Sequence, residues 1–162
     1  WGYKEWSLEK WPRIIDWLWD EYQMATVITG SPEEKERAGG LVKKCRGLVF
    51  NLAGRATLRD LAGLLSLSFL HIGVDSAPPH IAAALGTPTI TVYGPSDWFD
   101  WAPIGDRHKV VFADKECVPC YRKGCNDEGW SRCLDELEVE KVQAVIRETL
   151  DQAAFRQINY LT

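Results

Sequence analysis

Residues 73–96 read GVDSAPPHIAAALGTPTITVYGPS, and this stretch predicts a strand, a short helix, a second strand and a loop. The apolar run 69–74 is short enough for a buried strand, and it stops at Asp75, Ser76 and two prolines. Proline suits the first turn of a helix, where a missing N–H costs nothing. Gly86 is a typical residue for the end of that helix.

A second strand follows directly, because residues 89–93 are β-branched or aromatic. In a β-α-β unit the residues after the first strand lie at the carboxyl edge of a parallel sheet, where open α/β sheets bind ligands. The unit therefore places three polar side chains at a ligand-binding edge: Asp75, Ser76 and His80.

The rest of the chain repeats this alternation of strand and helix. Helices are expected at 7–22, 33–46, 58–67 and from 138 onwards. Strands are expected at 24–29, 48–52 and 109–112. The first helix is expected to be capped by Ser7, unless Pro12 bends it or starts it. Two glycines at 39 and 40 are expected to shorten the second helix, and Thr57 with Asp60 resembles a capping box for the third. The pattern predicts an α/β fold: a parallel sheet with helices on both faces.

Composition limits the kind of protein. The chain has 162 residues, 46% of them hydrophobic, which is ordinary for a globular domain. Its net charge of −4 argues against a nucleic-acid surface, and it contains no apolar run long enough to span a membrane. Because it opens at Trp1 and its only methionine is Met24, we expect it to be part of a longer protein.

Four of the five cysteines lie together in a loop expected at 113–133. Their spacing is C-x2-C-x4-C-x7-C, at Cys117, Cys120, Cys125 and Cys133. Four thiolates in a short loop suit a structural zinc ion. Two disulfides and four free thiols are the alternatives, and a reducing compartment would disfavour disulfides. A catalytic metal is not expected, since no histidine or carboxylate joins the set.

Four motifs in order resemble glycosyltransferase family 9, the ADP-heptose:lipopolysaccharide heptosyltransferases. They are K-x-W at 4–6, G-x-P-x-E at 30–34, G-x-x-S/T-L at 54–58, and the donor-site signature D-S-A-P-x-H with Y-G-P-S-D at 75–97. The resemblance covers about residues 4 to 105. It departs from many relatives at Ala77, where they carry glycine.

The resemblance implies a Rossmann-like domain that forms one half of a GT-B glycosyltransferase. Residues 1–162 would be the C-terminal, nucleotide-sugar-binding domain, without its first strand and without the N-terminal acceptor domain. The intact enzyme would transfer heptose from ADP-heptose to the lipopolysaccharide inner core with inversion and without a catalytic metal. It would work in the cytoplasm at the inner face of the inner membrane, with peripheral membrane association. The general base would lie in the missing domain, so this piece alone is expected to be inactive.

The resemblance also assigns donor-binding roles to eight residues: Lys4, Glu34, Ala56, Asp75, Ser76, Ala77, His80 and Gly94. Lys4 would neutralise the pyrophosphate, with Lys10 as a rival. Glu34, or else Glu33, would bind the ribose hydroxyls, and the backbone at Ala56 would touch adenine. Asp75 would hold heptose hydroxyls, while the residues at the start of the following helix would line the phosphates.

Two other kinds of protein share part of this pattern. One is a different nucleotide-binding Rossmann-like domain, such as half of a dehydrogenase. No G-x-G-x-x-G follows a strand, which counts against it. The other is a non-catalytic interaction module stapled by zinc. Nucleotide binding that depends on Asp75 would distinguish a glycosyltransferase from such a module.

Overall fold

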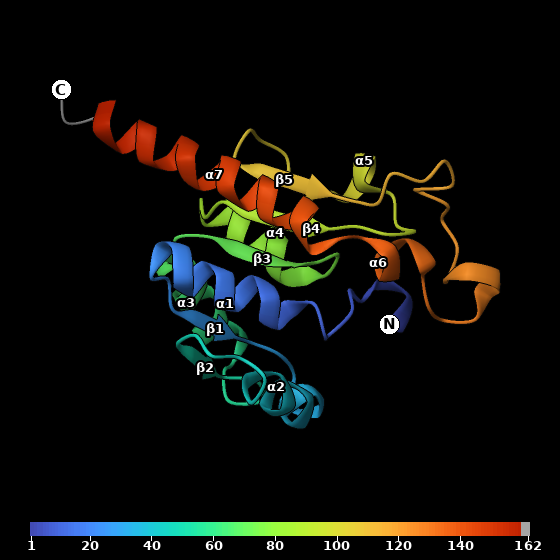
Figure 1. Cartoon of the computed structure of the whole chain (residues 1–162), viewed down its shortest axis with the longest axis horizontal. Coiled ribbons are helices and arrows are strands. Elements are labelled where there is room, and N and C mark those ends of the chain that lie inside the picture. The colour runs from blue at the N-terminus through green and yellow to red at the C-terminus, as the bar shows by residue number, and fades with distance from the viewer. Residues whose placement is uncertain (160–162) are drawn as a thin grey trace. The chain divides into compact units, whose positions relative to one another are not determined.

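The computed structural model describes residues 1–159, and side chains up to residue 152. The chain divides into two compact units (Figure 1). The first unit combines residues 1–6 with the chain from residue 68 onwards, and the second unit is residues 7–67. Each unit contains parallel strands and helices, so the predicted α/β class is confirmed.

A three-stranded parallel sheet forms the centre of the first unit. Its order is β3 (His71–Val74), β4 (Thr89–Val92) and β5 (His108–Val111). In this register Val92 lies opposite both Val74 and Val111, so the three strands end level with one another. All four residues of β4 are buried, as expected of the central strand.

Two helices pack on this sheet. Helix α4 (Ala77–Ala84) contacts β3 and β4, and helix α7 (Val139–Asn159) contacts β4 and β5 (Figure 1). The described part of α7 buries one stripe of apolar residues at helical spacing: Val139, Val142, Ile146 and Leu150. Gly86 has a φ of +82°, which explains why the chain turns out of α4 at this residue.

Short helices complete the first unit, and the sequence pattern does not predict them. They are η1 (Gly2–Lys4), α5 (Trp98–Trp101), η3 (Cys125–Asp127) and α6 (Arg132–Glu136). Each is five residues or fewer, so none contains enough turns to show a helical period.

The second unit contains two paired strands, three α-helices and one short 3-10 helix. In order these are α1 (Trp11–Tyr22), β1 (Thr26–Ile28), η2 (Pro32–Glu34), α2 (Lys35–Val42), β2 (Val49–Asn51) and α3 (Leu58–Leu67). Strands β1 and β2 pair in parallel, and α2 packs against β2. The predicted capping box at the start of α3 is confirmed: the Thr57 N–H donates to the Asp60 carboxylate at 2.9 Å, and the Asp60 N–H donates to the Thr57 hydroxyl at 3.2 Å.

Helix α4 begins at Ala77, so both prolines lie in its first turn as predicted. Two expectations about the elements need correction. Helix α1 begins at Trp11 and not after a Ser7 cap, so the alternative of a start at Pro12 is the nearer one. The strands form two sheets, one in each unit, where one was predicted. Sequence pattern indicates where strands lie but carries little information on which strands pair.

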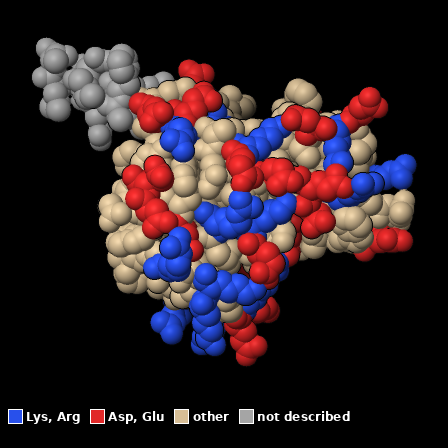
Figure 2. Space-filling model, viewed as in Figure 1, with Lys and Arg blue, Asp and Glu red and all other residues tan. Residues whose placement is uncertain are grey.

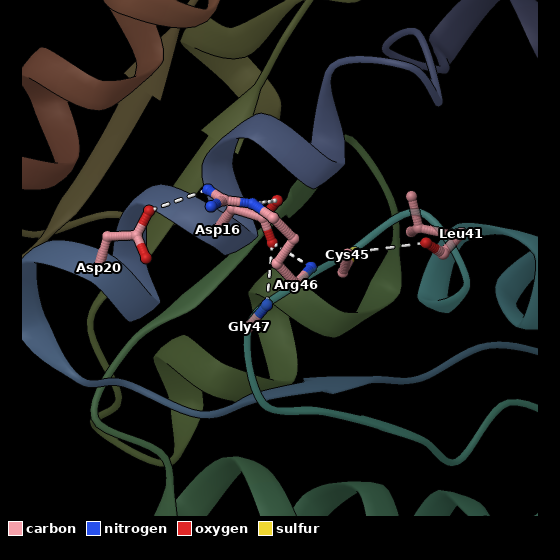
Figure 3. Close-up of polar contacts among 6 residues, drawn as sticks. All are labelled: Asp16, Asp20, Leu41, Cys45, Arg46 and Gly47. Carbon is pink, nitrogen blue, oxygen red and sulfur yellow. Dashed lines mark hydrogen bonds and ion pairs between the residues drawn. The ribbon is translucent and has the colours of Figure 1, made fainter.

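The half-buried carboxylate of Asp16 ties α1 to the turn before β2 (Figure 3). Asp16 accepts hydrogen bonds from the backbone N–H of Arg46 at 2.7 Å and of Gly47 at 3.0 Å, and the Arg46 guanidinium extends on to Asp20 at 3.0 Å. Burial opposes ionisation of Asp16, but the two N–H groups and the guanidinium outweigh it and lower its pKa. A side chain at Gly47 would meet Trp19 at 2.8 Å, so glycine is required there.

Charged side chains are interleaved over the face shown in Figure 2, without a large area of one sign. Among the described residues, several charged side chains form exposed ion pairs, such as Lys141 with Asp114 at 2.6 Å. Within residues 1–159, no helix combines the length and the apolar character needed to cross a bilayer.

Candidate functional site

An ion pair between Lys4 and Asp75 marks the candidate site in the first unit. The Lys4 ammonium donates to the Asp75 carboxylate at 2.5 Å, although 71 residues separate them in the sequence. Their side chains are only 23% and 10% exposed, so water screens this pair less than it screens the surface pairs. The ammonium also lies 5.2 Å from the centre of the Trp1 ring. The structure therefore brings the first and the fourth motif together.

Hydrogen bonds from the chain before α7 hold Lys4 in place. Trp6, the tryptophan of the K-x-W motif, is fully buried and donates its indole N–H to the Leu137 carbonyl at 3.1 Å. The Ser131 hydroxyl donates to the Tyr3 carbonyl at 2.6 Å. These two hydrogen bonds hold Tyr3 and Trp6, on either side of Lys4, in place. The Lys4 ammonium therefore lies at the carboxyl end of β3, beside Asp75.

Asp75 and Tyr93 directly follow two neighbouring parallel strands, β3 and β4. Tyr93 is buried and donates its hydroxyl to the Trp101 carbonyl of α5 at 3.1 Å. Burial and the negative charge of Asp75 together raise the pKa of Tyr93, so the phenol stays protonated and keeps this hydrogen bond. Tyr93 was not among the predicted site residues. The signal was available, since residues that follow neighbouring parallel strands share one edge.

The amino end of α4 adds polar groups beside Asp75. Ser76 is the N-cap residue, is exposed, and donates its hydroxyl to the Val74 carbonyl at 3.1 Å. Ala77 opens the helix, and His80 is exposed in its first turn. Prolines at the second and third positions remove two N–H donors, so side chains must supply more of any anion binding here.

Gly94 has a structural explanation that the sequence did not suggest. The prediction was that glycine here lets a ligand approach the backbone. In the structure Gly94 is buried, and a Cβ at this position would lie 2.7 Å from two carbons of Leu134 in α6. Close packing against Leu134 is therefore enough to require glycine, while the role toward a ligand remains a prediction.

The second and third motifs meet in the second unit. The Gly54 N–H donates to the Gly30 carbonyl at 3.0 Å, so the loops that follow β1 and β2 are joined by their backbones. Gly54 has a φ of +68°, and a Cβ there would lie 2.9 Å from Pro32. Gly30 and Gly54 thus allow the two loops to lie against each other. These loops follow neighbouring parallel strands and therefore lie at the same edge of the sheet.

Glu34 closes the turn that starts η2. Its carboxylate accepts the Ser31 backbone N–H at 2.7 Å, and a Cβ at Gly30 would lie 2.9 Å from the same carboxylate. The competing interpretation of Glu34, a helix-opening acid, therefore has direct support. A hydrogen bond from Ser31 lowers the pKa of the neighbouring Glu33. Both side chains are exposed, so neither is excluded from contact with a ligand by burial.

Two further predicted positions lie in the second unit. Ala56 is half-buried in the turn between β2 and α3. Its methyl side chain cannot form hydrogen bonds, so only its backbone could hydrogen-bond to a ligand. Lys10, the rival to Lys4, is the N-cap residue of α1. The ion pair with Asp75 is an observation in favour of Lys4.

The zinc interpretation of the four clustered cysteines finds no support. In the described part of the chain, no group of three or more His, Cys, Asp or Glu side chains is placed to hold a metal ion. Cys117, Cys120, Cys125 and Cys133 are all free thiols in this structure, which is the third of the alternatives that the sequence left open. Four cysteines at suitable spacing are necessary for such a site but do not fix where the sulfur atoms lie.

The site as a whole offers a cation, a carboxylate and hydroxyl groups at the carboxyl edge of a parallel sheet. A cation and the start of a helix suit phosphate, and a carboxylate accepts hydrogen bonds from sugar hydroxyls. These are the groups that a nucleotide sugar requires.

Comparison with known proteins agrees with this chemistry. The curated relatives include lipopolysaccharide heptosyltransferase 3 of Escherichia coli K12, which is 34% identical over 103 residues, 62% of this chain and 30% of the relative. Lipopolysaccharide heptosyltransferase 1 of Pseudomonas aeruginosa is 27% identical over 77% of this chain and 35% of its own length. The chain thus spans about a third of the length of these relatives.

Solved structures give the same result. E. coli heptosyltransferase WaaC with ADP-2-deoxy-2-fluoro heptose superposes with a TM-score of 0.66 and 30% identity, over 90% of this chain and 39% of WaaC. E. coli ADP-heptose lps heptosyltransferase II superposes with a TM-score of 0.79 over 94% of this chain and 44% of that structure; at 22% identity this match speaks for the fold alone. The family model for glycosyltransferase family 9 (heptosyltransferase) matches residues 1–131. The chain therefore belongs to glycosyltransferase family 9, the heptosyltransferases.

Proposed function

We propose that this chain is the donor-binding, C-terminal half of a GT-B heptosyltransferase that uses ADP-heptose. The Lys4–Asp75 ion pair is the observation that carries the proposal. It joins two motifs from distant parts of the sequence at the carboxyl edge of β3, where α/β sheets bind ligands. Family membership supports the choice of donor, since a solved relative holds ADP-2-deoxy-2-fluoro heptose.

The ion pair suggests how Lys4 and Asp75 compensate each other's charge. A carboxylate that is 10% exposed costs free energy unless it is paired, and Lys4 provides the partner. When the donor enters, its pyrophosphate attracts the Lys4 ammonium, and Asp75 is left to accept hydrogen bonds from sugar hydroxyls. As the glycosidic bond breaks, negative charge grows on the leaving nucleotide, and Lys4 stabilises it. The proposed role of Asp75 is thus to hold the sugar while Lys4 holds the leaving group.

The remaining parts of the proposal concern the whole enzyme. Ser76, the Ala77 N–H and His80 line the phosphates, while Glu34 and the backbone near Ala56 bind the nucleoside. The acceptor is the lipopolysaccharide inner core, bound by an N-terminal domain that also carries the general base for inversion. This chain by itself binds donor weakly and does not transfer heptose. The intact enzyme works at the cytoplasmic face of the inner membrane and associates with it peripherally.

The class of ligand can be tested by calorimetric titration of the chain with ADP, ADP-heptose, GDP and NAD. We expect ADP and ADP-heptose to bind, and GDP and NAD to bind at least tenfold more weakly. GDP lacks the adenine base, and NAD carries a second nucleoside where the donor carries a single sugar. Equal binding of NAD would point to a different nucleotide-binding domain. If none of the four ligands bound, a non-catalytic interaction module would be the better interpretation.

A further inference from the structure

The loop that carries the four clustered cysteines has no role in the proposed donor chemistry. We call residues 113–133 the thiol loop. Between residues 114 and 130 the one buried residue is Gly124, which has no side chain, so apolar packing does not hold this part of the loop in place. Hydrogen bonds and ion pairs order it instead, and four free thiols lie within it.

Polar contacts tie two parts of the thiol loop to α6. The Arg132 backbone N–H donates to the Cys125 sulfur at 3.4 Å, which places Cys125 beside the residue that precedes Cys133. Glu136 of α6 forms ion pairs with both Lys115 and Arg132, so the segment leading into Cys117 is held at the same helix. Burial raises the pKa of the Cys133 thiol, and the charges of the other three cysteines act on it as well.

The thiols differ in their access to solvent. Cys117 is exposed, Cys120 and Cys125 are half-buried, and Cys133 is buried. A small disulfide compound would therefore meet Cys117 first, and Cys120 is the half-buried thiol nearest to it in the sequence. Two cysteines separated by two residues are close enough along the chain to form a disulfide with each other.

The thiol loop is also bonded to both segments of the donor site. The Tyr121 N–H, directly after Cys120, donates to the Pro95 carbonyl at 2.8 Å, in the loop that begins with Gly94. At its other end, Ser131 donates to the Tyr3 carbonyl, next to Lys4. A change in the backbone conformation at Cys120 would therefore alter a hydrogen bond to the loop that follows β4.

We propose that the thiol loop is a thiol–disulfide exchange site in which Cys117 and Cys120 form a disulfide. The Cys117 thiolate attacks one sulfur of an external disulfide, forms a mixed disulfide and releases one thiol. The Cys120 thiolate then attacks the Cys117 sulfur and releases the second thiol. The chain loses two electrons and two protons overall, and the external disulfide gains both.

Closing the disulfide constrains the backbone next to Tyr121, and we expect this to weaken the Tyr121–Pro95 hydrogen bond. The loop after β4 then loses a support, and donor affinity falls. This second step rests on the proposed function. Loss of one such neutral hydrogen bond corresponds to a weakening of about fivefold.

Exchange with glutathione disulfide tests the site. The reduced chain is incubated with glutathione disulfide and its intact mass and peptide map are measured. We expect loss of two hydrogen atoms and a bond between Cys117 and Cys120. C120S should instead accumulate a stable glutathione adduct on Cys117, because the resolving thiol is gone. C45S is the matched control: Cys45 lies in the second unit with its thiol donating to the Leu41 carbonyl, and its removal should change nothing.

The site would be disproved by a wild-type chain that gains only glutathione adducts, by a disulfide mapped to another pair, or by a zinc ion retained by the reduced wild-type chain and lost in C120S. The coupling is measured separately, by titrating ADP into the reduced and the oxidised chain. A fivefold weaker affinity that dithiothreitol reverses supports it, and equal affinities contradict it. If neither form bound ADP, the proposed function would fail while the mass measurement would still decide the thiol chemistry.

Discussion

Gly94 shows why a residue in a motif can be required for two separate reasons. The sequence suggested a close approach between backbone and ligand, whereas the structure places Leu134 of α6 against this position. Nothing in the sequence predicted α6, so the packing reason could not have been found there. Asp75 is the opposite case, because its place directly after a strand was predictable and the structure confirms it, although this strand is half-buried and not buried as expected.

At Gly94 we expect G94A to lower the free energy of unfolding by about 1–3 kcal/mol, because the new methyl group overlaps Leu134. Urea unfolding of the whole chain measures the change. The matched control is G63A in α3, where a Cβ meets nothing within 4 Å. That substitution should stabilise the chain by up to about 1 kcal/mol, since alanine is the better helix former. If G94A still destabilised a chain already carrying L134A by the same amount, the overlap would not be the cause.

The Lys4–Asp75 pair shows that the sequence does not predict which side chains interact with each other. Each residue was predicted separately from a motif, and neither motif indicates a partner 71 residues away. Similarly, the carboxylate of Glu34 was expected to be open to ribose, but the structure shows it accepting the Ser31 N–H. Side-chain partners depend on tertiary placement, which residue types and spacing do not determine.

Among the elements, long periodic helices and apolar strands were the most predictable. Helix α3 has the predicted bounds, and α7 begins within one residue of the prediction. The short helices α5 and α6 were missed, although both contact residues of the candidate site: α5 through Trp101, and α6 through Leu134. Elements of one turn leave no period in the sequence, and here they are the ones that shape the edge of the sheet.

The contact between α1 and the turn before β2 gives a prediction for the second unit. We expect D16A to cost about 1–3 kcal/mol, because it leaves two backbone N–H groups without their acceptor. D20A should cost less than about 1 kcal/mol, since its pair with Arg46 is exposed. Urea unfolding of both variants and the parent chain measures the difference.

The same contact predicts a pH dependence. The pKa of Asp16 is lower in the folded chain than its ordinary value of 3.8. The stabilisation is therefore complete well above that ordinary value and is lost as the pH falls through the folded pKa. The difference between D16A and the parent chain should shrink in acid. A difference that stayed constant down to the lowest pH at which both chains fold would show that the carboxylate charge is not involved.

At the scale of the whole molecule, two α/β units contribute different parts of one family signature. The first unit holds Lys4 and Asp75, and the second unit holds the joined loops at Gly30 and Gly54. Alternation of strand and helix predicted the fold class. It did not predict two separate sheets, because the pairing partners of three-residue strands depend on contacts outside the strands.

The central claim is that Asp75 binds the sugar of ADP-heptose. The affinity of the D75N variant for ADP-heptose tests this claim most directly, with D114N as the control. Asp114 lies in the same unit and forms an exposed ion pair, so D114N removes one carboxylate charge away from the site. We expect D75N to bind ADP-heptose at least about tenfold more weakly than the parent chain, because a charged hydrogen-bond acceptor for the sugar is lost. Binding of ADP alone should not weaken, since Lys4 is freed for the phosphates, and D114N should match the parent for both ligands. Equal affinity of D75N and the parent chain for ADP-heptose would contradict the account.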